Sequence, residues 1–254
     1  MKAMVLAAGL GTRLRPLTND RPKALVEVAG RTLLEITLVR LFGIGIREVI
    51  INVHHCADQI EEFLALRGNF GMRIEISSED DLLLDTGGGL KKAAWFFLEK
   101  SGDSRPDDPF LLHNVDVISN IDLRAMIAFH QQQRALATLA VQGRETSRYL
   151  LFDDAMRLCG RRTGREENAA TEWARDSGKV QALAFSGIHV ISPRLLGMIR
   201  EQGAFSIIST YLRLAGQGER ILAFRADEAY WRDLGKPENV AQAAEDFERG
   251  MVRF

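Results

Sequence analysis

The chain has 254 residues, 46% of them hydrophobic, and is therefore long enough to bury the core of one large α/β domain. Lys and Arg total 33 against 34 Asp and Glu, and a net charge of −1 argues against nucleic acid or an anionic membrane as the main partner. Cys56 and Cys159 show no metal-binding spacing, which favours free buried thiols in a reducing cytosol. Because no apolar run approaches the roughly 18 residues of a membrane span, we expect a soluble cytoplasmic protein.

The first half of the chain alternates short β-branched runs with helical patterns, which predicts parallel βαβ units. We expect strands at 3–6, 48–52, 73–77, 110–114 and 137–141. Helices are expected at 32–42, 57–66, 90–98 and 123–134. The pattern predicts an α/β fold with a Rossmann-like, mixed but mainly parallel central sheet flanked by helices.

The pattern changes after residue 142. The run RYLLFD and the segment before RLCG are predicted to form a hairpin, and the polar, glycine-punctuated segment 160–178 is interpreted as a surface insertion. A strand from Val180 follows, then helices at 193–201 and 207–215, a strand at 221–225 and a closing helix at 237–249.

A glycine-rich loop follows the first expected strand. Gly9, Gly11 and Thr12 place backbone N–H groups where a turn can wrap an anion. A dinucleotide fingerprint would need a third glycine where Leu14 stands, and the GxxxxGK pattern of a P-loop is absent. Taken alone, the GxG is weak evidence, and a simple tight turn is the alternative.

Cations beside this loop favour a phosphate ligand. Pro16 and Pro22 argue against helix here, so Arg13 and Lys23 are expected on an extended segment that aims both at one ligand. A lone surface Arg or Lys is usually a solvated charge. Two cations tied to a glycine turn at the carboxyl end of a strand instead favour phosphate binding.

Two aspartates are candidate metal ligands. Asp116 follows the strand at 110–114, and Asp233 follows a later apolar segment, although each alone fits an ordinary turn or helix cap. Mg²⁺ needs only one or two carboxylates, with phosphate oxygens and water completing its octahedron. A second glycine cluster, DTGGGLKKA at 85–93, opens a helix and could lie against a base or ribose, with a flexible helix entry as the alternative.

In this order, these pieces resemble the sugar-1-phosphate nucleotidyltransferases, also called nucleotide-sugar pyrophosphorylases. TGGG at 86–89, FSGIHV at 185–190 and YWRDLGKPE at 230–238 resemble further family segments, so the resemblance spans nearly the whole chain. It is strongest for short single-domain members that use N-acetylmuramate 1-phosphate or mannose 1-phosphate. The residues that match the GxGTRLxPLT…PKxL signature are Gly9, Gly11, Thr12, Arg13, Pro16, Leu17, Thr18, Pro22, Lys23 and Leu25.

The resemblance implies a nucleotide-diphospho-sugar transferase fold and a single domain over 1–254, with a nucleotide half at 1–142 and a sugar half at 143–254. It implies that Arg13 and Lys23 are catalytic, that Asp116 and Asp233 hold Mg²⁺, and that the partners are a nucleoside triphosphate and a sugar 1-phosphate. Asn114 and Gly187 would face the sugar phosphate. The implied nucleotide-binding residues are Leu6, Ala7, Ala8, Gly9, Gly11, Thr12, Thr86, Gly87 and Gly88.

The chain also departs from the family pattern. Val115 stands where glycine usually precedes the metal aspartate, Asp85 replaces a glutamate before TGGG, and a Glu-Lys pair of many relatives is not evident near 192–194. Two alternatives therefore stay open: a nucleotide-sugar-dependent glycosyltransferase and a non-catalytic pyrophosphorylase-like regulatory subunit. The base, the sugar and the oligomeric state are not specified by residue types.

Overall fold

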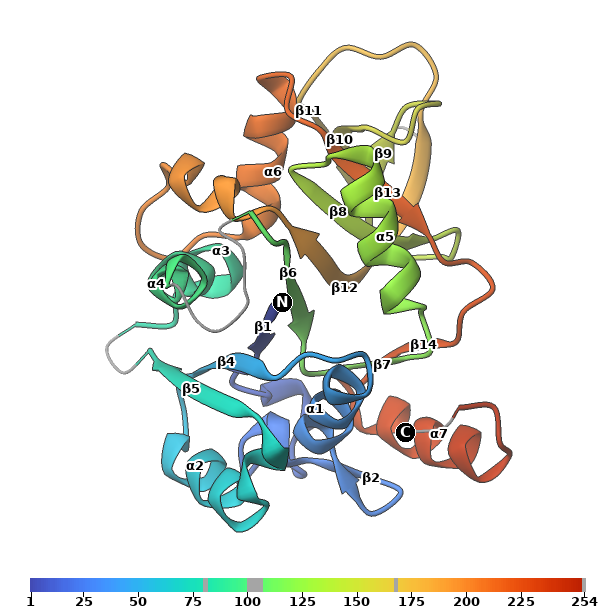
Figure 1. Ribbon diagram of the computed structural model, residues 1–254. Helices are drawn as coiled ribbons and strands as arrows, with labels where there is room; N and C mark the ends of the chain where they lie inside the picture. The colour runs from blue at the N-terminus through green and yellow to red at the C-terminus, as the bar shows by residue number, and fades with distance from the viewer. Residues whose placement is uncertain (80–81, 100–106, 167–168, 253–254) are drawn as a thin grey trace.

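A mixed sheet forms the centre of the protein in the computed structural model, which describes residues 1–79, 82–99, 107–166 and 169–252 (Figure 1). Within these residues its path is β11-β10-β9-β12-β6-β1-β4-β5, and β8 joins β12 to β13. The strands are β1 (Lys2–Leu6), β4 (Glu48–Val53), β5 (Arg73–Ser78), β6 (Phe110–Asn114), β8 (Ala137–Gln142), β9 (Arg148–Phe152), β10 (Leu158–Thr163), β11 (Thr171–Trp173), β12 (Gln181–Ile191) and β13 (Ile221–Arg225).

The amino-terminal part of this sheet is parallel. β1 lies between β4 and β6, β5 extends beyond β4, and all four run in one direction. β12 then runs antiparallel to β6, β8 and β9. Two small ladders complete the strands: β2 (Glu27–Val28) with β3 (Arg31–Thr32), and β7 (Val117–Ser119) with β14 (Trp231–Asp233). The expected α/β fold with a central mixed sheet flanked by helices is confirmed.

Helices cover both faces of the sheet and enclose two cores. Alternation along β1 sends Ala3 and Val5 into one core with α1, α2, α5 and α7, and Met4 into the other with α3, α4 and α6 (Figure 1). The helices are α1 (Leu33–Gly43), α2 (Ala57–Leu66), α3 (Asp85–Lys92), α4 (Ala94–Leu98), α5 (Leu123–Gln133), α6 (Ile207–Gly216) and α7 (Pro237–Glu248), with 3-10 turns η1 (Thr12–Leu14), η2 (Lys23–Leu25), η3 (Gly68–Gly71) and η4 (Pro193–Met198).

Several expected elements differ in the structure. The helix expected at 90–98 starts earlier, at Asp85, and breaks at Ala93, which lets Phe97 stack on Phe110 with ring centroids 3.9 Å apart. The helix expected at 193–201 is only the 3-10 segment η4, because Arg213 donates hydrogen bonds to the Met198 carbonyl and the Glu201 carboxylate. Hydrogen bonds from the Arg213 side chain here take the place of the backbone hydrogen bonds that a longer helix would make.

The second hairpin strand was expected before RLCG, but it is β10 and includes LCG. The reason is a turn in which Asp153 accepts backbone bonds from Met156 and Arg157. The segment 160–178, interpreted as a polar insertion, contributes the end of β10 and all of β11 to the edge of the main sheet. Cys159 is buried as expected, whereas Cys56 is half-buried, and both thiols are free. No helix in the described ranges is long and apolar enough to cross a bilayer.

Candidate active site

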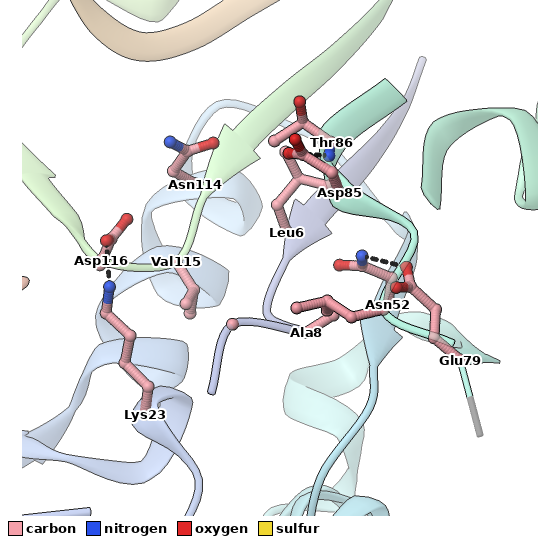
Figure 2. Close-up of a pocket in the computed structure, with 12 residues that line it drawn as sticks. Leu6, Ala8, Lys23, Asn52, Glu79, Asp85, Thr86, Asn114, Val115 and Asp116 are labelled. Carbon is pink, nitrogen blue, oxygen red and sulfur yellow. Dashed lines mark hydrogen bonds and ion pairs between the residues drawn. The ribbon is translucent and has the colours of Figure 1, made fainter. Parts of the chain in front are cut away.

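A cavity of about 350 Å³ opens at the carboxyl ends of β1, β4 and β6 (Figure 2). Open α/β sheets bind ligands at this edge. The glycine loop after β1 forms one wall and the start of α3 forms another. The lining residues are Leu6, Ala8, Gly9, Lys23, Asn52, Glu79, Leu83, Asp85, Thr86, Asn114, Val115 and Asp116.

The loop after β1 is held in a tight conformation. Gly11 has a positive φ of 64°, and a Cβ built there would lie 2.9 Å from Thr18 Cγ2, so glycine suits this position on both counts. The Thr18 hydroxyl and the Leu14 N–H both donate to the Gly11 carbonyl at 2.8 Å. Thr12 and Arg13 follow in η1 and are exposed. Arg13 was expected on an extended segment and lies instead in a 3-10 turn.

Lys23 also begins a 3-10 turn, η2, because Pro22 starts the turn and its carbonyl accepts the Leu25 N–H at 2.9 Å. The Lys23 ammonium donates to Asp116 Oδ2 in an ion pair at the cavity wall (Figure 2). The two side chains are only 11% and 16% exposed. This pairing places one cation and one carboxylate together in the wall of the cavity.

A buried polar network forms the back of the cavity. Asn52 Oδ1 accepts the Ala7 N–H at 2.8 Å, and Asn52 Nδ2 donates to Glu79 Oε1 at 2.7 Å. The other Glu79 oxygen accepts the Leu84 N–H at 2.8 Å. A Cβ on Gly89 would lie 2.7 Å from Glu79 Oε1, so only glycine lets α3 pack this close. Sequence reasoning missed Asn52 and Glu79, although polar residues at the ends of parallel strands signal such a site.

The glycines of TGGG pack the helix rather than line the cavity. The N–H groups of Gly87 and Gly88 both donate to the Phe205 carbonyl, at 2.9 and 3.3 Å, and both glycines are buried. A Cβ on Gly87 would collide with the Phe205 ring. Thr86 and Asp85 do line the cavity, and the Thr86 N–H donates to Asp85 Oδ1 at 2.5 Å. Direct contact of Gly87 and Gly88 with a nucleotide stays a prediction.

Val115 replaces the glycine that is usual before the metal aspartate. Its side chain is buried and lines the first cavity next to Asp116 (Figure 2). Its N–H donates to the Leu6 carbonyl at 3.1 Å, which fixes the turn after β6 against β1. The β-branched side chain therefore narrows the cavity without breaking the backbone link.

A second cavity, of about 600 Å³, meets the first at Asn114, which lines both. Gly187 also lines it, with a positive φ of 75°, and a Cβ there would lie 2.9 Å from Val117 Cγ2 and 3.0 Å from Asn114 Nδ2. The structure thus brings together the two residues expected at a sugar phosphate. The full lining is Arg13, Asn114, Val117, Arg144, Thr146, Ser147, Arg148, Phe185, Gly187, Trp231 and Asp233.

The two expected metal aspartates lie on neighbouring backbone segments, Asp116 in the wall of the first cavity and Asp233 in the wall of the second. Asp233 pairs with Val117 in the β14–β7 ladder, and the next N–H, from Leu234, donates to the Asp116 carbonyl at 2.8 Å. A Cβ on Gly235 would lie 2.8 Å from both Arg13 Nη2 and Asp233 Oδ1. The Arg13 guanidinium and the Asp233 carboxylate therefore both lie next to Gly235.

This donor set fits Mg²⁺. Carboxylate oxygens are the ligands that this ion takes from proteins, and it fills its other positions with phosphate and water. Within the residues that the structure describes, no group of three His, Cys, Asp or Glu side chains could hold a metal. Asp116, which is paired with Lys23, and Asp233 together supply the one or two carboxylates that Mg²⁺ needs when it binds together with a phosphate ligand.

Comparison with known proteins defines the class. Residues 2–152 match the family model described as nucleotidyl transferase. An N-acetylmuramate alpha-1-phosphate uridylyltransferase from Caulobacter vibrioides is 36% identical over 93% of this chain and 92% of its own length. A mannose-1-phosphate guanylyltransferase from Mycobacterium tuberculosis is 28% identical over 98% of this chain, which spans 65% of that longer relative. The chain therefore belongs to the nucleotidyl transferase family.

A solved structure supports the fold. A putative glucose-1-phosphate thymidylyltransferase from Bacillus anthracis, solved with a sucrose, superposes with a TM-score of 0.79 at 17% identity and covers 100% of this chain and 97% of that one. The family model and the relatives above confirm the resemblance to the sugar-1-phosphate nucleotidyltransferases and favour it over a glycosyltransferase.

Proposed function

We propose that the protein joins a nucleoside triphosphate to a sugar 1-phosphate with the help of Mg²⁺, and that it releases an NDP-sugar and pyrophosphate. The junction of the two cavities carries this proposal. Asn114 lines both, and the Lys23–Asp116 pair and Asp233 lie around it. A nucleotide in one cavity and a sugar phosphate in the other would meet there with their reacting groups close together.

Each cavity has a role in this proposal. The first holds the nucleoside against Leu6, Ala8, Gly9 and Thr86, with Ala7, Gly87 and Gly88 shaping the wall behind it. Gly11 and Thr12 shape the phosphate loop. Asn114 and Gly187 face the sugar phosphate in the second cavity.

The chemistry needs positioning more than proton transfer. An oxygen of the sugar phosphate attacks the α-phosphorus in line and forms a new P–O bond, while the bond to the β-phosphate oxygen breaks and pyrophosphate leaves. The attacking oxygen is already anionic near neutral pH, so no general base is required. Arg13 and Lys23 stabilise the charge on the transferring phosphoryl group.

Asp116 and Asp233 would hold the Mg²⁺ ion, which when bound supplies charge neutralisation on the phosphates. Lys23 already neutralises one oxygen of Asp116, and an arriving triphosphate offers the ammonium a second anionic partner. Before a nucleotide binds, the Lys23 ammonium is therefore already held close to the proposed phosphate position rather than free in solvent.

UTP and N-acetylmuramate 1-phosphate are the first substrate pair to test, because the Caulobacter relative is named for them. The experiment measures pyrophosphate release with Mg²⁺ across the four ribonucleoside triphosphates and dTTP against several sugar 1-phosphates. Asp116→Asn is the inactive control, since it removes a carboxylate with little change in volume. Release that requires both substrates and disappears in Asp116→Asn supports the proposal.

Silence across this matrix, with nucleotide still bound, would favour the regulatory-subunit alternative. Val115 is the feature that would support such a role, because it narrows the nucleotide cavity where relatives have glycine. The presence of Arg13, Lys23, Asp116 and Asp233 together favours catalysis.

A further inference from the structure

Arg144 is fixed in the wall of the second cavity by two contacts. Its guanidinium lies over the Trp231 ring, with Cζ 3.5 Å from the ring centroid, and its Nη2 donates to the Phe185 carbonyl at 2.8 Å. Trp231 is itself held, because its indole N–H donates to the Ser186 carbonyl at 2.8 Å. A stacked, hydrogen-bonded guanidinium loses little further freedom when it binds a ligand.

The Arg144 guanidinium also has a hydrogen-bond donor and a charge that no other described residue pairs with. Its Nε is buried and has no hydrogen-bond partner among the described residues, and no carboxylate of that part of the chain lies within ion-pair distance of it. Burial lowers the pKa of Arg144, against the opposing effect of Asp233, yet an arginine stays charged near neutral pH. A half-buried cation without an anionic partner is costly unless a ligand supplies one.

The surroundings of Arg144 carry an excess of positive charge. Arg13 and Arg148 line the same cavity, and Asp233 is the only carboxylate among its lining residues in the described ranges. Thr146 and Ser147, on the loop between β8 and β9, add hydroxyl groups. Three guanidinium groups against one carboxylate suit an anionic ligand with polar groups around it.

We infer that Arg144 binds an oxyanion of the sugar substrate and thereby selects it. This inference rests on the proposed function, because it assigns the second cavity to the sugar 1-phosphate. The planar fork of a guanidinium matches two oxygens of a phosphate or of a carboxylate. The oxyanion is either the 1-phosphate itself or a carboxylate carried by the sugar, and two matched sugars distinguish these sources.

The test titrates the wild type and Arg144→Gln by calorimetry, with Mg²⁺ and a non-hydrolysable UTP analogue present. The ligands are N-acetylmuramate 1-phosphate and N-acetylglucosamine 1-phosphate, which differ by one O-lactyl group and the carboxylate that it carries. Because Arg144→Gln removes a charged hydrogen bond, we expect about a 10- to 100-fold loss of affinity. An equal loss for both sugars assigns the oxyanion to the 1-phosphate, and a loss confined to the first assigns it to the sugar carboxylate.

Matched variants separate binding from folding. Arg194→Gln removes the same charge from an exposed pair with Glu219 and should leave both affinities unchanged. Arg144→Lys keeps the charge but loses the planar fork, so its affinity for the sugar phosphates should lie between those of the wild type and Arg144→Gln. Affinity for the UTP analogue alone should be the same in all three variants, which shows that the nucleotide cavity is intact.

Sugar affinities within twofold of wild type in Arg144→Gln would overturn the inference, as would an equal loss of affinity for the UTP analogue. If the wild-type protein bound the sugars and released pyrophosphate in that case, the proposed function would stand and only the role of Arg144 would fall. A wild-type protein that bound neither sugar phosphate would overturn both.

Discussion

Replacing Asn52 with alanine should destabilise the protein and weaken nucleotide binding together. The amide is 3% exposed and Glu79 is 1% exposed, so water cannot readily replace the lost bonds. The change leaves the Ala7 N–H unpaired, at a cost of about 1–3 kcal/mol, and removes a hydrogen bond to a charged group, worth about 1.5–3 kcal/mol. We expect the free energy of unfolding to fall by about 3 kcal/mol, near the lower end of these combined costs.

The assay is urea unfolding followed by tryptophan fluorescence, together with a thermal melt. For a chain of this size about 1 kcal/mol corresponds to roughly 2–4 °C, so the Tm should fall by roughly 6–12 °C. Gln132→Ala, which removes an amide from an exposed position of α5, is the control and should change the Tm little.

A second comparison tests the network itself. In Asn52→Ala alone, the buried Glu79 carboxylate loses its hydrogen-bond partner. The double variant Asn52→Ala/Glu79→Gln also removes that charge, so it should be more stable than the sum of the two single effects predicts. A fall below about 1 kcal/mol in Asn52→Ala, or strict additivity in the double variant, would refute the reasoning that these groups act as one buried network.

Two further predictions concern charge. Lys23→Ala should lower kcat/KM by roughly two to three powers of ten, because the transferring phosphoryl group loses one charge-stabilising donor. Arg21→Ala removes an exposed cation nearby and should leave kcat/KM within a few-fold of wild type. Equal kinetics for the two variants would contradict the role of Lys23. Burial lowers the pKa of His113 and His189 to about 3 and that of His130 to about 4, so these rings are neutral when folded and gain protons on unfolding below pH 6.5. The free energy of unfolding should therefore fall as the pH drops from about 6.5 toward 4, by up to about 1.4 kcal/mol per pH unit for each ring. In His130→Gln one fewer proton is taken up on unfolding, so the free energy of unfolding, measured by urea titration, should depend less steeply on pH.

The parts of the site that lie on short loops were predictable from the sequence, because their residue types reflect local needs. Gly11 has the positive φ that its turn requires. Asp116 lies beside Lys23 because it follows β6, whose carboxyl end pairs with that of β1, and the loop after β1 leads to Lys23. The helix at Ala57–Leu66 and the strand at Ile221–Arg225 match the expected bounds because their apolar periodicity is strong.

What the sequence missed depends on contacts between distant segments. The glycines of TGGG were expected to lie against a base or ribose, and this stays a prediction, but a Cβ on Gly87 would also collide with Phe205, which lies far along the chain. A Cβ on Gly89 would come too close to the carboxylate of Glu79. No sequence pattern singles out Arg144, and only its place over Trp231 makes it a candidate ligand. No local pattern encodes such pairs, because each residue type is compatible with many partners.

Asn114 forms a wall of both cavities, and this shared wall has a consequence for inhibitor design. Two separate ligands each lose their translational and rotational freedom when they bind, whereas one molecule that spans the wall loses it once. If the proposed function holds, a compound that tethers a nucleoside group to a charged sugar mimic through a short linker past Asn114 would gain from this effective concentration. Neither half alone would have this advantage, so the architecture favours bisubstrate compounds over ligands that fill one cavity.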